Sequence, residues 1–303
     1  MTSARTPLKS PSTKVAASQS PSQASRIGRH LLRKRSAQIG GVIFLLLVFL
    51  ALFGPIITPY DPFDIKIEQR LSPPSVQHIF GTDEQGRDLF SRIIYGARYA
   101  LLIMIITTVI GAVGGLSLGI PSAYFGGSAD MLVMRLMDVM LGFPYILLIL
   151  AIVAILGPSL ENAMVAIGFA NIPTFARLAR ASILVVKEQD YVTAERALGA
   201  GPTRIMFRTI LPNILSPIIV YVSLTMPTAV LAAASLSFLG LGAQPPLPEW
   251  GTMMVNARDF IVTAPWVVLS PGLTIFVVVL GINLLGNAMR DVLDPRDSAT
   301  RMS

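Results

Sequence analysis

The 303-residue chain is too apolar to be an ordinary soluble domain. Hydrophobic residues make up 53% of it and charged residues 14%, and the mean hydropathy is +0.65, values typical of a protein embedded in a bilayer. The absence of cysteine excludes disulfides, thiolate metal sites and S-acylation. The formal net charge is +7, but the basic residues cluster beside apolar runs, which favours a membrane-topology signal over nucleic-acid binding.

Residues 1–38 are rich in Ser, Thr, Pro and Lys and predict a disordered cytoplasmic tail. The tail ends in a basic cluster around Arg33-Lys34-Arg35, as expected for a cytoplasmic flank in contact with anionic lipid. The apolar run Ile39–Ile57 follows. It is long and has no A-x-A cleavage site after it, so it predicts a retained first transmembrane helix within residues 39–59 and disfavours a signal peptide.

Residues 60–98 are predicted to form an external connection with an interfacial helix in its second part. Thr82 or Asp83 is expected to cap this helix. Four apolar residues recur at helical spacing and define its buried face: Leu89, Phe90, Ile93 and Ile94. Three charged residues are expected to stay in water: Arg87, Asp88 and Arg92. Such a helix would lie on the membrane surface or on a partner subunit.

A metal site in the same segment is the less favoured interpretation. Its candidate ligands are His78, Asp83, Glu84 and Asp88. No histidine or cysteine spacing typical of a metal site accompanies them, so a capped polar loop explains them better.

Five further spans are predicted from apolar length. They are Ala100–Ser122, Val139–Leu156, Met164–Val186, Pro212–Leu236 and Pro265–Leu285. With the first helix, they predict an all-α membrane protein of six transmembrane helices. The core occupies residues 99–290, and residues 291–303 form a cytoplasmic C-terminal tail.

Residues inside the spans have two competing interpretations. Gly111, Gly115 and Gly119 form a small-xxx-small series, which indicates close helix packing. Four polar or kink-forming residues are candidates for lining a transport pathway: Asn171, Pro173, Asn283 and Asn287. Prolines are also common in such helices, and isolated asparagines often bond to a neighbouring helix, so both interpretations stay open.

Residues 187–212 interrupt the apolar pattern with a polar and basic segment. Tyr191–Leu198 is predicted to be a short helix that stops at Gly199, and Thr203–Ile210 a second short helix. If Gly199 has a positive φ, a β-branched residue there would be strained. Pro212 then opens the next span. Two short helices that meet at a glycine bend form a knob suited to docking on another protein. An ordinary cytoplasmic loop is the alternative.

This segment resembles a known motif. Thr193-Ala194-Glu195, Gly199 and Leu211-Pro212 are similar to the EAA coupling loop of ABC importer permeases. Three positions depart from that pattern: Thr193 replaces Glu, Glu195 replaces Ala and Thr209 replaces Ile.

Three further stretches resemble the C-type permease subunit of the dipeptide, oligopeptide, glutathione and nickel importers. They are residues 80–98, residues 237–253 and the ending Arg290–Pro295, and the likeness extends over residues 40–295. The resemblance implies a type I ABC importer permease fold in a bacterial inner membrane. It also implies a B-type permease subunit, two ATPase subunits, an external solute-binding protein and surrounding membrane lipid. The implied function is ATP-driven peptide import by alternating access, with nickel or another small solute as the alternative.

The chain contains no G-x-x-x-x-G-K-[ST] phosphate loop. ATP and Mg are therefore expected on partner subunits, and this chain is expected to be no enzyme and to bind no cofactor or metal. An intramembrane enzyme would need a carboxylate pair, a nucleophile with a base or a histidine site in a span. A self-sufficient channel or secondary transporter stays open, since six helices alone do not exclude it. With an inside N-terminus, six spans place both termini and the segment 187–212 in the cytoplasm.

Overall fold

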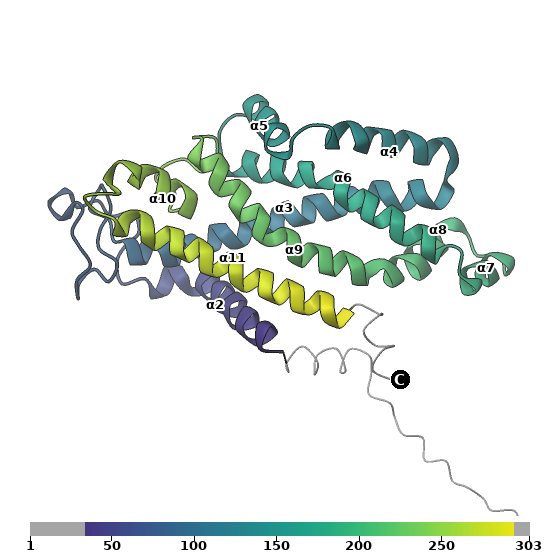
Figure 1. Cartoon of the computed structure of the whole chain (residues 1–303), viewed down its shortest axis with the longest axis horizontal. Helices are drawn as coiled ribbons and strands as arrows, with labels where there is room; N and C mark the ends of the chain where they lie inside the picture. The colour runs from purple at the N-terminus through teal and green to yellow at the C-terminus, as the bar shows by residue number, and fades with distance from the viewer. Residues whose placement is uncertain (1–33, 294–303) are drawn as a thin grey trace, which may run out of the picture.

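The computed structural model describes residues 34–293, and within this range the chain is helical with no β-strand. Five long apolar helices run along the molecule (Figure 1). They are α2 (Arg35–Ile57), α3 (Leu89–Phe125), α6 (Leu160–Val186), α9 (Leu211–Phe238) and α11 (Trp266–Leu293). Five of the predicted spans correspond to these five helices, the span Ala100–Ser122 lying inside α3.

The two ends of the bundle carry different short elements (Figure 1). One end, called the loop end below, carries residues 58–88 with η1 (Ile67–Gln69), together with α10 (Trp250–Ala257) and η3 (Arg258–Phe260). The opposite end, called the α7 end, carries α7 (Asp190–Ala197) and α8 (Pro202–Arg204). Residues 1–33 and 294–303, including most of the predicted tails, lie outside the described range.

The predicted span Val139–Leu156 is not one continuous helix. Instead, α4 (Gly127–Leu141) and α5 (Tyr145–Leu156) meet at an angle of 92°. Pro144 explains the break, because proline disfavours helical geometry at the preceding residue and lacks an N–H for the helix ladder. The 12 residues of α5 reach only about 18 Å, too short to cross a bilayer alone. The described residues thus contain five candidate spans, or six if the bent pair counts as one.

The predicted interfacial helix is the beginning of α3. Asp88, and neither Thr82 nor Asp83, caps it by accepting a hydrogen bond of 2.7 Å from the backbone N–H of Ser91. The helix then continues without a break through the predicted span Ala100–Ser122 and ends at Phe125. It is 37 residues long, or about 56 Å, so its first turns are one continuous helix with the predicted span.

The charged residues before and within the start of α3 are buried, contrary to the prediction. Arg87, Asp88 and Arg92 are each exposed by 4% or less. The carboxylate of Asp83 lies 2.7 Å from Arg87 Nε and 3.4 Å from Arg92 Nε, and Arg92 Nη1 donates to the carbonyl of Pro62 at 2.8 Å. Opposite charges and carbonyls from the folded loop therefore replace water around these groups.

Two other candidates for the metal site also have protein partners. His78 Nδ1 lies 2.8 Å from Asp88 Oδ1, and Arg87 donates to Glu84 at 3.3 Å. Burial, followed by the neighbouring charge of Asp83, raises the pKa of the Glu84 carboxyl. These side chains thus form part of a compact ionic cluster that holds residues 58–88 on the start of α3.

Three glycines bring α3 and α6 into close contact. A Cβ placed on Gly115 would lie 2.4 Å from the Cβ of Phe175, and one on Gly119 would lie 2.7 Å from the carbonyl oxygen of Ala176. A Cβ on Gly111 would lie 2.9 Å from the Cβ of Asn171. Larger residues at these positions would force the two helices apart.

Candidate coupling surface

The short helix α7 stands at the tip of the bundle, between the ends of α6 and α9 (Figure 1). Its position depends on Val192, which is fully buried in an apolar cluster with Ile183 of α6 and with Ile205 and Ile210. After the end of α6, the ammonium of Lys187 donates a hydrogen bond of 3.2 Å to the carbonyl of Ala123 in α3. The knob is therefore anchored by contacts with α6, while Lys187 at the end of α6 is tied to α3.

Gly199 forms the bend after α7. Its φ is +83°, so the condition for strain in a β-branched residue at this position is met. The backbone N–H of Ala200 bonds to the carbonyl of Glu195, and that of Gly199 bonds to the carbonyl of Arg196, both at 3.0 Å. This pattern closes the helix with a left-handed residue, a conformation that glycine adopts without steric cost.

The predicted second short helix, Thr203–Ile210, is not separate. The chain passes from α8 through the π-helical segment η2 (Ile205–Ile210) directly into α9, as one apolar helical stretch from Pro202 to Phe238. Pro212 explains the π-helical turn, because it has no N–H to continue the ladder and the preceding turn widens around it. The side chain of Asn213 bonds to the carbonyl of Thr209 at 2.7 Å. The knob is consequently continuous with α9.

Two positions that depart from the EAA pattern contact each other across the bend. The hydroxyl of Thr209 donates a hydrogen bond of 2.7 Å to the carboxylate of Glu195. Thr209 is only 8% exposed, whereas Thr193 and Ala194 are exposed on the outer side of α7. Sequence reasoning missed this pair, although its signal was present: two polar substitutions occur together where the pattern has Ala and Ile.

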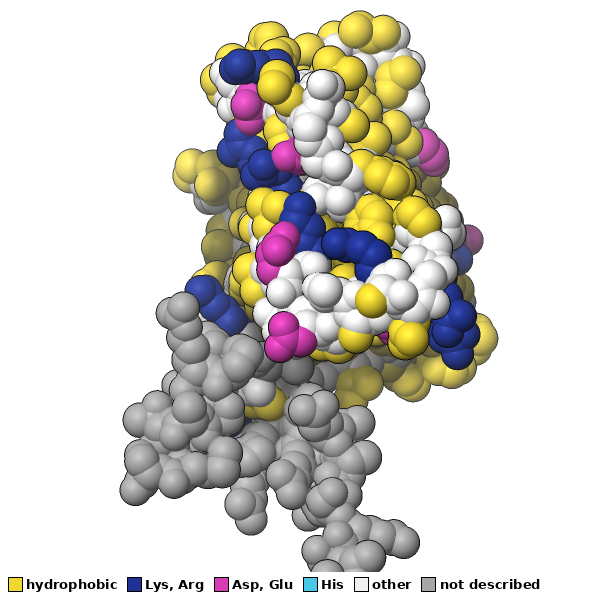
Figure 2. Space-filling view, turned by 90° about the vertical axis from the view of Figure 1, so that its right-hand side faces the viewer, with side chains coloured by type: hydrophobic (Ala, Val, Ile, Leu, Met, Phe, Trp, Pro, Cys, Tyr) yellow, Lys and Arg dark blue, Asp and Glu magenta, His cyan; other side chains and the backbone are white. Residues whose placement is uncertain are grey.

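The outer surface of the knob combines apolar and basic side chains. Tyr191, Leu198 and Phe207 are exposed by 44%, 87% and 58%. Three exposed arginines accompany them: Arg196, Arg204 and Arg208. Figure 2 looks onto this end and shows Lys and Arg side chains next to acidic and apolar ones. Exposed aromatic and arginine residues are the composition expected of a protein contact surface.

Ion pairs fasten α4 to α6 near the α7 end. The guanidinium of Arg180 makes contacts of 2.7 to 2.9 Å with both carboxylate oxygens of Asp130, and Arg177 bonds to Asp138. The two pairs join residues 50 and 39 positions apart in the chain, so the fold alone brings them together.

The candidate pathway residues lie on two helices and in different surroundings. Asn171 and Pro173 are buried in α6, where Asn171 packs beside Gly111 of α3. The side chain of Asn283 bonds to the carbonyl of Val279 in its own helix at 2.9 Å, and Asn287 is exposed. Their role in a pathway stays a prediction.

Residues 115–298 match the protein family described as the binding-protein-dependent transport system inner membrane component. Residues 22–74 match the N-terminal TM domain of oligopeptide transport permease C. A solved structure titled as an inward-facing conformation of the MetNI methionine ABC transporter is similar with a TM-score of 0.55 and 21% identity. The match covers 66% of this chain and 96% of that chain. The fold is therefore that of a type I ABC importer permease.

Several relatives are similar over most of their length. The di/tripeptide transport system permease protein DppC of Pseudomonas aeruginosa is 50% identical over 85% of this chain and 88% of that protein. The dipeptide transport system permease protein DppC of Alkalihalophilus pseudofirmus is 46% identical, and the glutathione transport system permease protein GsiD of Pectobacterium atrosepticum 44%. Each of these two matches covers 88% of this chain; they cover 88% of the Alkalihalophilus protein and 89% of the Pectobacterium protein. The chain belongs to the family of binding-protein-dependent transport system inner membrane components.

Proposed function

We propose that this chain is the C-type permease subunit of an ATP-driven importer that carries short peptides, glutathione-like peptides included, across a bacterial inner membrane. The observation that carries the proposal is the anchored knob of α7 and Gly199. It combines exposed apolar and arginine side chains with a continuous connection into α9. Relatives named for dipeptide, di/tripeptide and glutathione transport support the choice of solute class.

The proposed assembly contains a B-type permease, two ATPase subunits and an external solute-binding protein. ATP and Mg bind to the ATPase subunits. Closure of the ATPase dimer moves the docked knobs together, and α6 and α9 transmit this movement because Val192 and Ile210 pack the knob against both. The helix bundle then turns from inward to outward opening, and hydrolysis resets it. In this chain the proposed coupling residues are Thr193, Ala194, Glu195, Gly199, Leu211 and Pro212.

The proposed orientation places the α7 end and both termini in the cytoplasm and the loop end outside. The basic residues of segment 187–212 and of the cluster before α2 support it, because positive charge is enriched in cytoplasmic segments. Residues 60–98 then include the external connection, and residues 99–290 include the permease core. In this orientation the two tails, residues 1–38 and 291–303, lie in the cytoplasm.

The decisive experiment is reconstitution of the complex in vesicles with the binding protein, with and without the ATPase subunits. Labelled dipeptide, glutathione and nickel are offered separately. We expect peptide uptake that requires ATP and disappears without the ATPase subunits. Uptake that continues without them would identify a self-sufficient transporter, and uptake of nickel alone would exclude peptide import.

A further inference from the structure

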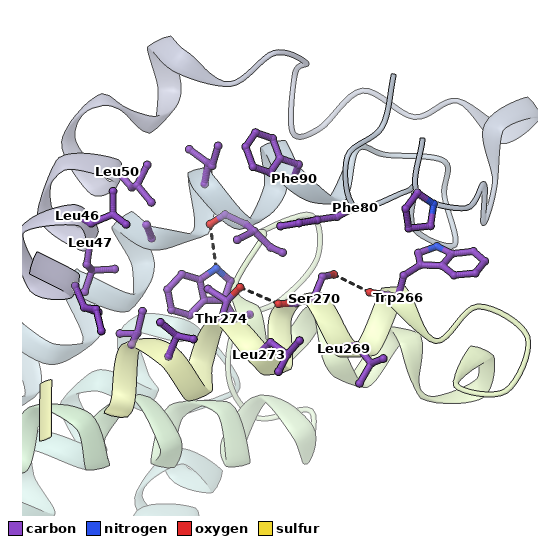
Figure 3. A pocket seen from close by; sticks show the side chains of 18 residues that line it. Leu46, Leu47, Leu50, Phe80, Phe90, Trp266, Leu269, Ser270, Leu273 and Thr274 are labelled. Carbon is purple, nitrogen blue, oxygen red and sulfur yellow. Dashed lines mark hydrogen bonds between the residues drawn. The ribbon is translucent and has the colours of Figure 1, made fainter. Parts of the chain in front are cut away.

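An apolar groove of about 510 Å³ opens between α2, α3 and α11 at the loop end (Figure 3). Helix packing explains why it exists. A Cβ on Gly40 would lie 2.4 Å from the carbonyl oxygen of Gly281, so α2 contacts α11 closely at one end. At its other end, α2 contacts α3 instead, where a Cβ on Gly54 would lie 3.0 Å from the carbonyl oxygen of Ile94. The helices α2 and α11 therefore diverge, with α3 between them as the floor.

The groove walls provide almost no hydrogen-bonding groups. The hydroxyls of Ser270 and Thr274 donate to carbonyls of their own helix at 2.7 and 2.8 Å, and Trp250 Nε1 donates to the carbonyl of Ile93 at 3.1 Å (Figure 3). The remaining indole N–H, that of Trp266, is enclosed against Gly81. An occupant of this groove must therefore be apolar.

The length of the groove corresponds to one leaflet of a bilayer. Along α11 its wall extends from Trp266 to Val278, which at 1.5 Å per residue is about 18 Å. Half of the hydrocarbon core of a bilayer is about 15 Å. Trp266 stands at the outer limit of this wall, and tryptophan is enriched where membrane and water meet. The groove is open sideways, since Leu46, Leu269 and Leu273 in its walls are exposed by more than half.

The groove suits a narrow, extended apolar occupant. It is apolar, about 18 Å long and open to the side, and a single file of methylene groups is about 4 to 5 Å wide at carbon contact distances. An α-helix with side chains is at least 10 Å across and is the alternative occupant that the tests below distinguish.

We infer that this groove is a binding site for one acyl chain of a phospholipid. In the orientation proposed above, the lipid comes from the outer leaflet. The inference rests on the proposed function for this orientation and for the complex used in the tests. The chain fills the space between α2 and α11 and secures the outer half of α2 to the core.

The first test uses native mass spectrometry to count the phospholipids that stay with the complex after purification in mild detergent. Leu46→Trp and Leu273→Trp fill the groove from its two walls. Leu45→Trp and Leu280→Trp are matched controls, because these leucines are exposed on the same helices but do not line the groove. We expect both groove variants to lose one phospholipid per complex and both controls to keep it. Equal lipid counts in all four variants and in the unaltered protein would overturn the inference.

A second test covers the case in which the tryptophan variants assemble poorly. A photo-reactive amino acid replaces Leu273 in the complete complex, and irradiation is followed by mass analysis. We expect this chain to gain the mass of one phospholipid. A cross-link to the second permease subunit would overturn the inference, because it would mean that a protein helix occupies the groove. Since neither readout requires ATP hydrolysis or uptake, both are independent of the proposed transport function.

Discussion

The carboxylate of Glu195 and the hydroxyl of Thr209 are joined by a hydrogen bond of 2.7 Å that connects α7 to the π-helical turn before α9. The bond crosses the Gly199 bend and links residues 14 positions apart. It gives the knob a polar connection to α9 in addition to the apolar cluster around Val192. The angle between α7 and α9 therefore depends in part on this pair.

Thr209→Val is expected to loosen this connection. A hydrogen bond to a carboxylate that is only half buried contributes about 1 kcal/mol, or about fivefold in an equilibrium. We expect the number of ATP molecules hydrolysed per imported solute molecule to rise by up to about fivefold. Thr209→Ser is the control, because it retains the hydroxyl. Coupling in Thr209→Val equal to that of the unaltered transporter would show that the bond has no role in transmission.

Gly199→Val is expected to uncouple hydrolysis from uptake. At a φ of +83° a β-branched residue costs on the order of 1 to 3 kcal/mol in backbone strain, which is enough to tilt α7. Gly201→Val is the matched control: Gly201 has a φ of −69°, and a Cβ at either glycine would meet no atom within 4 Å. We expect Gly199→Val to reduce co-purification of the ATPase subunits while pairing with the second permease stays normal.

Glu195→Ala is expected to be milder than Gly199→Val, because it removes one hydrogen bond and leaves the bend unstrained. The same two assays, ATPase co-purification and solute-stimulated hydrolysis in reconstituted membranes, measure both variants. Normal values of both for Gly199→Val would exclude the coupling assignment.

Gly115→Val is expected to destabilise the contact between α3 and α6. Its Cβ would lie 2.4 Å from the Cβ of Phe175 and 2.7 Å from the backbone nitrogen of Ala176, and overpacking of this kind costs about 1 to 3 kcal/mol. Gly41→Val in α2 is the control, because a Cβ there would meet no atom within 4 Å. Thermal unfolding of the purified complex is the measurement, and equal midpoints for the two variants would contradict the packing role.

Reporter fusions test the proposed orientation. A reporter after Ser303 should be cytoplasmic, and one inserted near Ser75 in the loop end should be external. Labelling both insertions with an impermeant reagent, before and after lysis, distinguishes the two sides. Placement of both reporters on one side would contradict the six-span arrangement.

Deletion of Met1–Ser20 tests the N-terminal tail, which lies outside the described residues. Its composition predicts little ordered contact, so complex formation and uptake should be nearly unchanged. Failure of the shortened chain to assemble would instead indicate that the tail binds a partner subunit.

The sequence alone determined the long helices and the bend. Apolar runs of about 20 residues predicted α2, α6, α9, α11 and the greater part of α3, because in a bilayer a single segment can satisfy its backbone hydrogen bonds only as a helix. Gly199 was predictable for a similarly local reason, since a positive φ strongly favours glycine. These features depend on neighbours along the chain.

Only the tertiary structure decided where the charged residues lie. Arg87 and Arg92 were expected in water, but Asp83 and the carbonyl of Pro62 pair with them inside the folded loop. The bond between Glu195 and Thr209 likewise requires the bend to bring two helices together. Burial of a polar group is favourable only when a distant partner arrives with suitable geometry, and neither local propensity nor apolar periodicity specifies that partner.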